Sequence, residues 1–189
     1  MSDTQSILDR TAFVTRFGHI YEHSAWIAAQ AFDSGLLPAF LSEPGRDVAG
    51  ELLSISEACE LGSVMASILA GSSEEQKLEL ILAHPDLVGR AALAGELTDE
   101  STVEQSSAGL DRCSPEELER FTRANAAYRA RFEFPFIMAV RGADRQSILN
   151  AFERRLNNTK DEEFHTALTE IDRIALLRLE ALVNDRAVQ

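Results

Sequence analysis

Helix-start signals followed by apolar residues at helical spacing recur from one end of this chain to the other. The clearest start is Ser114-Pro115-Glu116-Glu117, with a serine cap, a proline at the first helical position and a glutamate three residues on. It predicts a helix to about Phe132, and a similar start at 159–162 predicts a last long helix to about Asn184. Repeated amphipathic helices predict an all-α fold.

One stretch alone resembles a β-strand. Residues 134–140 read FPFIMAV, but Pro135 cannot donate to a sheet, so this stretch is predicted to be an extended segment. Prolines and a glycine mark 36–47 as a loop, and two glycines break up 88–100. Further helices are predicted over residues 9–21, 22–34, 48–70, 72–84 and 144–157, with Leu78, Ile81 and Leu82 as the apolar face of the fourth.

Length and charge limit the classes of protein to consider. The chain has 189 residues, which fits one compact helical bundle spanning residues 1–189. Its net charge of −13 argues against binding to nucleic acid or to an anionic membrane. No apolar run is long enough to span a membrane, and the first residues lack the pattern of a signal peptide. Two isolated cysteines do not form a disulfide framework, so a cytoplasmic protein is expected.

His84 and Glu104 are the residues best suited to acid–base chemistry. His84 closes a predicted helix and precedes Pro85, which forces a sharp change of chain direction. A histidine and a glutamate form a usable acid–base pair if the fold brings them together. Each also has a structural interpretation. The imidazole could cap the end of its own helix, and Glu104 could complete a capping box with Ser101.

Arg178 is the most informative position on the last helix. It falls on the apolar stripe of that helix, seven residues after Ile171. Arginine is seldom buried without a partner. Either its guanidinium extends to solvent at the helix end, or it pairs with an anion inside the protein.

The run His19-Ile20-Tyr21-Glu22-His23 matches the H-x-x-E-H signature of a class of zinc peptidases. That signature needs both histidines one turn apart on a helix and a third ligand from elsewhere. Such short matches occur often by chance, so a zinc peptidase remains an alternative function. A helical adaptor without catalytic activity is a second alternative.

Taken together, several motifs resemble the 2-oxo-4-hydroxy-4-carboxy-5-ureidoimidazoline (OHCU) decarboxylase family of urate breakdown. The resemblance spans about residues 13–183, in the family's order, and the chain departs from it at Glu133, where the family often has glycine. The matching motifs are Phe17-Gly18-x-x-Tyr21-Glu22-His23-Ser24-x-Trp26, Ala83-His84-Pro85-Asp86-Leu87, Leu97-Thr98-x-Glu100-Ser101-Thr102-x-Glu104-Gln105, Ala108-Gly109-Leu110-Asp111, Asn125-Ala126-Ala127-Tyr128, Phe134-Pro135-Phe136-Ile137 and Leu177-Arg178-Leu179.

This resemblance implies an all-α decarboxylase that uses no cofactor and no metal and forms a homodimer. Its small-molecule substrate would be OHCU, and its products (S)-allantoin and carbon dioxide. The family's catalytic histidine and glutamate map to His84 and Glu104, and its arginine maps to Arg178 as a substrate-binding residue. The other substrate-contacting positions map to Pro85, Ser101, Gln105, Phe136 and Ile137. The resemblance also predicts that His84, Glu104 and Arg178 converge on one pocket.

Overall fold

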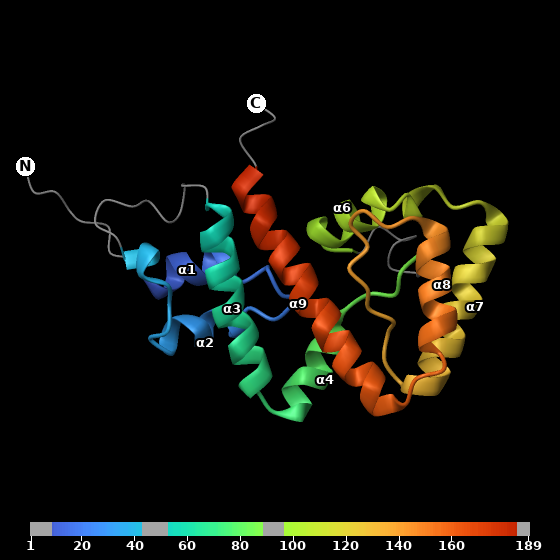
Figure 1. Ribbon diagram of the computed structural model, residues 1–189, viewed down its shortest axis with the longest axis horizontal. Helices are drawn as coiled ribbons and strands as arrows, with labels where there is room; N and C mark the ends of the chain where they lie inside the picture. Colours follow the sequence, from blue (N-terminus) through green and yellow to red (C-terminus); the bar gives the residue numbers. More distant parts are fainter. Residues whose placement is uncertain (1–8, 43–52, 89–96, 185–189) are drawn as a thin grey trace, which may run out of the picture. The chain divides into compact units, whose positions relative to one another are not determined.

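The computed structural model describes residues 9–42, 53–88 and 97–184, and every regular element within them is helical (Figure 1). No strand occurs in those ranges, so the predicted all-α fold is confirmed. None of the helices described there is both long and apolar enough to cross a membrane. The α-helices are α1 (Arg10–Phe17), α2 (Trp26–Asp33), α3 (Ile55–Gly71), α4 (Glu74–Ala83), α6 (Asp99–Ser107), α7 (Pro115–Phe132), α8 (Arg145–Arg155) and α9 (Lys160–Asn184), with 3-10 turns at Ala39–Ser42 and Leu110–Arg112.

The capped starts behave as the sequence predicts. Ser114 Oγ accepts the backbone N–H of Glu117 at 3.2 Å, and the Glu117 carboxylate accepts the Ser114 N–H at 2.8 Å. Thr159 and Glu162 form the same reciprocal pair at the start of α9, at 3.2 and 2.7 Å. Each box satisfies backbone donors that the first helical turn leaves unpaired.

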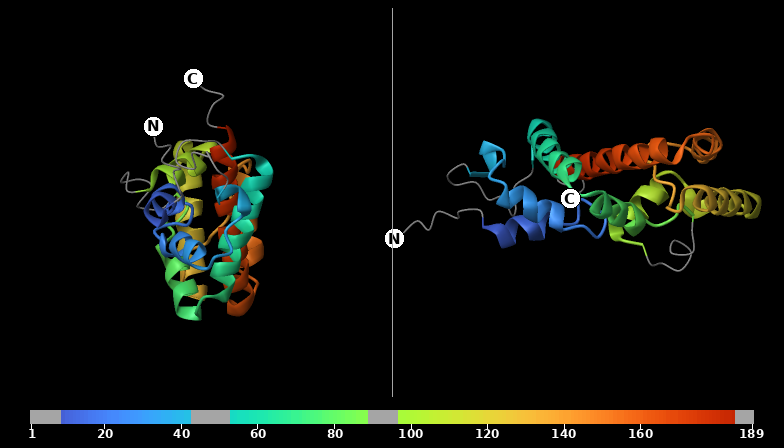
Figure 2. Two further views of the ribbon diagram at one scale, coloured as in Figure 1. Left: turned by 90° about the vertical axis from the view of Figure 1, so that its left-hand side faces the viewer. Right: turned by 90° about the horizontal axis from the view of Figure 1, so that it is seen from below.

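Contacts divide the chain into two compact units. The first contains residues 1–80 and 172–189, and the second contains residues 81–171. In the first unit α1 packs on α2 and α2 packs on α3, and α1 and α2 stay adjacent in both views of Figure 2. Phe13 stacks at an angle against Phe17 and Phe32 in this core. The single domain expected over residues 1–189 stays a prediction.

The second unit is built around Tyr128 on α7. Its ring meets the rings of Phe132, Phe136 and Phe152 at centroid distances of 4.6, 5.2 and 6.0 Å. Helices α7 and α8 lie side by side here (Figure 1). Residues 134–140, between these two helices, are mostly buried and form no regular secondary structure, so they are not a β-strand. The aromatic residues of that segment therefore belong to the core and fix its path.

Two local predictions were wrong. The first helix ends at Phe17 and the second begins at Trp26, so residues 18–25 form turns, with His23 at a φ of 47°. On α4, Ile81 is buried as predicted and Leu80 is buried as well, whereas the predicted core residues Leu78 and Leu82 are exposed. Apolar residues at 78, 80, 81 and 82 fit two helical faces equally well, so the spacing did not decide which face is buried. The predicted helix over 48–70 is confirmed from Ile55 onward, and residues 48–52 lie outside the described ranges.

Candidate active site

His84 lies one residue beyond the end of α4, and it is buried, with 7% of its surface exposed. Its backbone N–H donates to the carbonyl of Ile81 at 3.2 Å, which closes the last turn of the helix. Pro85 then prevents the helix from continuing, so the chain turns away at this point. The sequence Ala83-His84-Pro85 thus places a buried imidazole at a helix end, as predicted.

The loop that follows His84 is held by side chains of two helices. Arg129 of α7 donates through Nε to both carboxylate oxygens of Asp86, at 2.8 and 3.0 Å. Asn125, one turn earlier on α7, donates to the carbonyl of Leu87 at 2.7 Å. Gln105 of α6 accepts the backbone N–H of Val88 at 3.1 Å. Residues 85–88 are therefore fixed by direct contacts and not by the chain path alone.

Helix α6 carries three of the predicted site residues. Ser101 and Gln105 lie one turn apart and are both buried, and Glu104 is partly exposed beside them. The N-cap of α6 is Thr98, whose hydroxyl accepts the backbone N–H of Ser101 at 3.3 Å. Glu104 is therefore the sixth residue of the helix, so the interpretation of Ser101 and Glu104 as a capping box is wrong. The carboxylate does not serve the helix start.

Phe136 and Ile137 lie in the buried segment between α7 and α8 of the same unit. Arg155 of α8 donates to the carbonyl of Ile137 at 2.7 Å and lies over the ring of Phe136, 4.4 Å from its centroid. Glu163 pairs with the same guanidinium at 2.8 Å and also accepts the hydroxyl of Tyr128. This buried network holds the backbone carbonyl of Ile137 and contacts the ring of Phe136, two predicted substrate-contacting positions. Burial together with Glu163 raises the pKa of Tyr128.

Arg178 belongs to the first unit and is buried, so its head does not extend to solvent. One terminal nitrogen donates to Glu22 at 3.0 Å, with the two side chains 4% and 1% exposed. The other donates to the carbonyl of Ile20 at 3.3 Å. The sequence could place Arg178 on a buried stripe, but not identify a partner 156 residues away.

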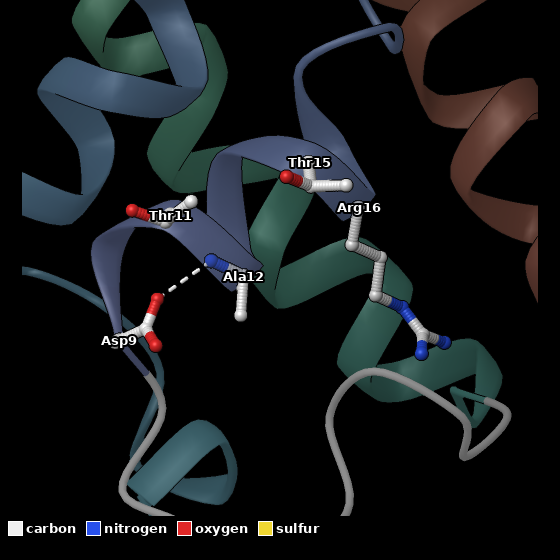
Figure 3. A pocket seen from close by; sticks show the side chains of 5 residues that line it. All are labelled: Asp9, Thr11, Ala12, Thr15 and Arg16. Atoms are coloured by element: carbon white, nitrogen blue, oxygen red, sulfur yellow. Dashed lines mark hydrogen bonds between the residues drawn. The ribbon is translucent and has the colours of Figure 1, made fainter.

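The zinc-peptidase alternative loses its geometry. His19 and His23 lie in the turns between α1 and α2, not one turn apart on a helix, and Glu22 between them pairs with Arg178. Across the described ranges, His, Cys, Asp and Glu side chains do not gather in threes as a metal site would require. A shallow hollow of about 460 Å³ lies along α1 (Figure 3) but contains none of the predicted site residues; it is lined by Asp9, Thr11, Ala12, Thr15 and Arg16.

The second unit contains most of the predicted site residues. His84 and Pro85 share a loop with Val88, which Gln105 holds, and Ser101 and Glu104 share α6 with Gln105. The convergence of Arg178 with His84 and Glu104 stays a prediction. Sequence reasoning missed the supporting residues Asn125, Arg129 and Arg155. The i, i+4 spacing of the first two on α7 is a signal that could have found them.

An all-α chain with a buried histidine at a helix end, next to a loop held by polar side chains, fits a small helical enzyme better than an adaptor. The sequence model described as OHCU decarboxylase matches residues 6–180. The chain therefore belongs to the OHCU decarboxylase family.

Individual relatives agree with this assignment. A protein of Haloferax volcanii named 2-oxo-4-hydroxy-4-carboxy-5-ureidoimidazoline decarboxylase is 42% identical over 91% of this chain and 89% of its own length. A protein of the same name from Halalkalicoccus jeotgali is 39% identical over 94% and 89%. The crystal structure of an (S)-allantoin synthase is 33% identical, with a TM-score of 0.65 over 94% of this chain and 52% of that one. Neither alternative function gains support from these matches.

Proposed function

We propose that this chain converts OHCU to (S)-allantoin and carbon dioxide. Membership of the family carries the proposal, together with the buried His84 at the loop that Gln105 holds. The substrate's carboxyl-bearing carbon adjoins a C=N carbon. When the bond to the carboxylate breaks, its electron pair can move toward that nitrogen as carbon dioxide leaves. The substrate supplies its own electron sink, so no cofactor is expected.

The protein's task is to orient this molecule and to control its protons. We assign His84 and Glu104 as the acid–base pair around the 4-hydroxyl and the reacting carbon. Protonation of one face by this pair gives a single enantiomer of allantoin. Positioning and fixed charges can supply much of the reduction in the barrier.

The binding residues divide by what they can donate or accept. Arg178 and Ser101 are assigned to polar oxygens of the substrate, and Pro85 with the backbone near Phe136 and Ile137 lines the same site. Gln105 already uses its oxygen on Val88, so its Nε2 is left as a donor to a ring or ureido carbonyl. The pair with Glu22 supports this role for Arg178 because it fixes the direction of the guanidinium.

Beyond the single chain, we propose that the protein works as a homodimer in the cytoplasm. Sedimentation at micromolar concentration should give twice the 20.8 kDa of one chain. A monomer that retains full activity would contradict the proposed dimer but not the proposed reaction.

The reaction is tested by mixing this protein with urate, a urate oxidase and the enzyme that opens the oxidised ring. Circular dichroism then follows the formation of optically active allantoin. Spontaneous decay of the substrate gives racemic allantoin, which has no circular dichroism, so the signal reports the enzyme-catalysed reaction alone. EDTA should leave the rate unchanged. Racemic product at the spontaneous rate would contradict the proposed function, and EDTA-sensitive activity restored by zinc would favour the peptidase-like alternative.

A further inference from the structure

One peptide group near the candidate active site is held from both of its ends. The Leu87 carbonyl accepts from Asn125 Nδ2 at 2.7 Å, and the N–H of the next residue, Val88, donates to Gln105 Oε1 at 3.1 Å. These two backbone groups belong to the same amide plane. Two side-chain amides, one from α7 and one from α6, therefore set the orientation of a single peptide group. This peptide joins Leu87 and Val88, in the loop that follows His84.

The backbone at this peptide is strained. Val88 has a φ of 54°, a left-handed conformation that a β-branched residue rarely adopts. Such a conformation is energetically unfavourable and persists only where the surroundings impose it. The two amide contacts supply that constraint, because a rotation of the peptide would break both of them.

The buried amide of Asn125 satisfies one of its polar groups and leaves the other without a partner among the described residues. The residue is 7% exposed, and within the described part of the chain its Oδ1 is buried without a hydrogen-bond partner. A buried acceptor without a partner destabilises the folded state, because its hydration is lost and not replaced. Leucine would fill a similar volume without that cost, so packing alone does not favour an amide here. Among the described residues, donation from Nδ2 to Leu87 is the one hydrogen bond that an amide at this position makes.

The Leu87–Val88 peptide in turn determines which atom of the Gln105 amide can contact a substrate. A backbone N–H can only donate, so the oxygen of the Gln105 amide has to face Val88. The Nε2 group then points away from the loop, and no described residue bonds to it. A substrate carbonyl can use this donor, whereas a substrate N–H cannot.

We propose that Asn125 is a positioning residue that acts through the Leu87–Val88 peptide on Gln105, and thereby selects a carbonyl of the substrate at that point. This inference rests on the proposed function, in which Gln105 contacts the substrate. It adds a residue that does not touch the substrate, and it sets the direction of the hydrogen bond that Gln105 makes.

The kinetic test is a double-mutant cycle in the allantoin assay. Asn125→Leu should raise KM about 3–10-fold with little change in kcat, which corresponds to the loss of one well-placed hydrogen bond. Gln105→Ala should raise KM at least as much. Adding Asn125→Leu to Gln105→Ala should have no further effect, because the residue that Asn125 positions is already gone. Asn157→Leu is the matched control, since its amide also donates to a backbone carbonyl but is exposed.

The structural test does not depend on activity. Hydrogen exchange of the Val88 N–H should be slow in the wild type and at least about tenfold faster in Asn125→Leu, with no change in Asn157→Leu. If Asn125→Leu does not fold, Asn125→Asp keeps the shape and removes the donor, and the same expectations apply to it.

Multiplicative effects in the cycle, or unchanged exchange at Val88, would overturn the inference while the proposed function stands. Racemic product from the wild type would instead remove the proposed function and the kinetic role with it. Exchange at Val88 would then still show whether Asn125 holds the peptide.

Discussion

Glu104 offers the sharpest test at the scale of single residues. Because Thr98 caps α6, the Glu104 carboxylate is not needed to start the helix. Glu104→Gln keeps the size and removes the charge, so we expect turnover to fall about 10²–10⁴-fold while the protein stays folded. In His84→Ala the turnover should fall by a similar factor. Rates and circular dichroism of the product are measured together with thermal unfolding.

The control for this pair is Glu119→Gln, the same change at an exposed position of α7. It should leave rate and rotation unaltered. Wild-type rate and rotation in Glu104→Gln would contradict the catalytic assignment of Glu104, and the acid–base role would then rest on His84 alone.

Asp172 gives a pH-dependent prediction. Its carboxylate accepts the hydroxyl of Tyr21 at 2.8 Å, and burial raises its pKa even though that hydrogen bond lowers it. A pKa above the unfolded value means that the folded state binds the proton more tightly. The ionised group therefore costs stability at neutral pH. Asp172→Asn keeps an acceptor for Tyr21 and should raise the melting temperature at pH 7.

The advantage of Asp172→Asn should shrink as the pH falls toward the unfolded pKa of about 3.9. Asp33 is the opposite case, because its exposed pair with Arg10 lowers its pKa. Asp33→Asn should therefore lower the melting temperature slightly at pH 7 and converge with the wild type in acid. Equal behaviour of the two variants between pH 4 and 7 would contradict the burial argument for Asp172.

What the sequence can predict about single residues depends on how local their partners are. His84 was placed correctly at a helix end because Pro85 follows it directly. Helical spacing placed Arg178 on the apolar stripe of its helix but left open whether its guanidinium is buried, because Glu22 lies on a distant turn that no spacing rule reaches. Glu104 was given a structural alternative that failed, because Thr98 and Ser101 can both cap a helix and only the structure shows which one does.

At the scale of elements, Glu133 ends α7 in a left-handed conformation, with a φ of 67°. Glycine adopts this conformation without steric cost, so glycine would be favoured at this helix end. Glu133→Gly and Glu133→Ala both remove the exposed pair with Lys160. The glycine variant should nevertheless melt about 2–4 °C higher than the alanine variant, because alanine retains the strain.

A helix interior supplies the control for that comparison. Gly is about 1 kcal/mol less favourable than Ala within a helix, so Ala130→Gly, at an exposed position of α7, should lower the melting temperature. An alanine variant at 133 as stable as the glycine variant would show that the left-handed cap is not required in solution.

Helix starts were easier to predict than helix ends, because the contacts that mark a start join residues close in sequence. A capping box is a contact between residues three apart, so Ser114 and Thr159 could be recognised from the sequence alone. The end of α1 carries no comparable signal beyond Gly18. The turns that follow it are stabilised by contacts from α9, such as the bond from Arg178 to the Ile20 carbonyl.

At the scale of the whole molecule, the all-α class followed from periodicity and caps, both of which are local. The residues that support the candidate site were not predictable in this way. Asn125 acts on a loop 38 residues away and Arg155 on a carbonyl 18 residues away. Such contacts depend on tertiary packing, which cannot be read from local patterns in a single sequence.

The net charge of −13 makes a last prediction for the molecule as a whole. Uncompensated carboxylates repel one another in the folded state, and salt screens that repulsion over a Debye length that falls from about 30 Å at 0.01 M to about 8 Å at 0.15 M. Salt also weakens the exposed ion pairs, but each of these contributes only about 0–1 kcal/mol. The melting temperature at pH 7 should therefore rise between these two concentrations of NaCl.

Acid provides the control for this effect. Near the sequence isoelectric point of about 4.7 the excess negative charge is gone, so only the weakening of ion pairs remains. The same increase in NaCl should then leave the melting temperature unchanged or lower it. Chloride is preferred to sulfate, because sulfate strengthens apolar burial and would raise stability at either pH. An equal rise at both pH values would mean that the salt acts on something other than the excess charge.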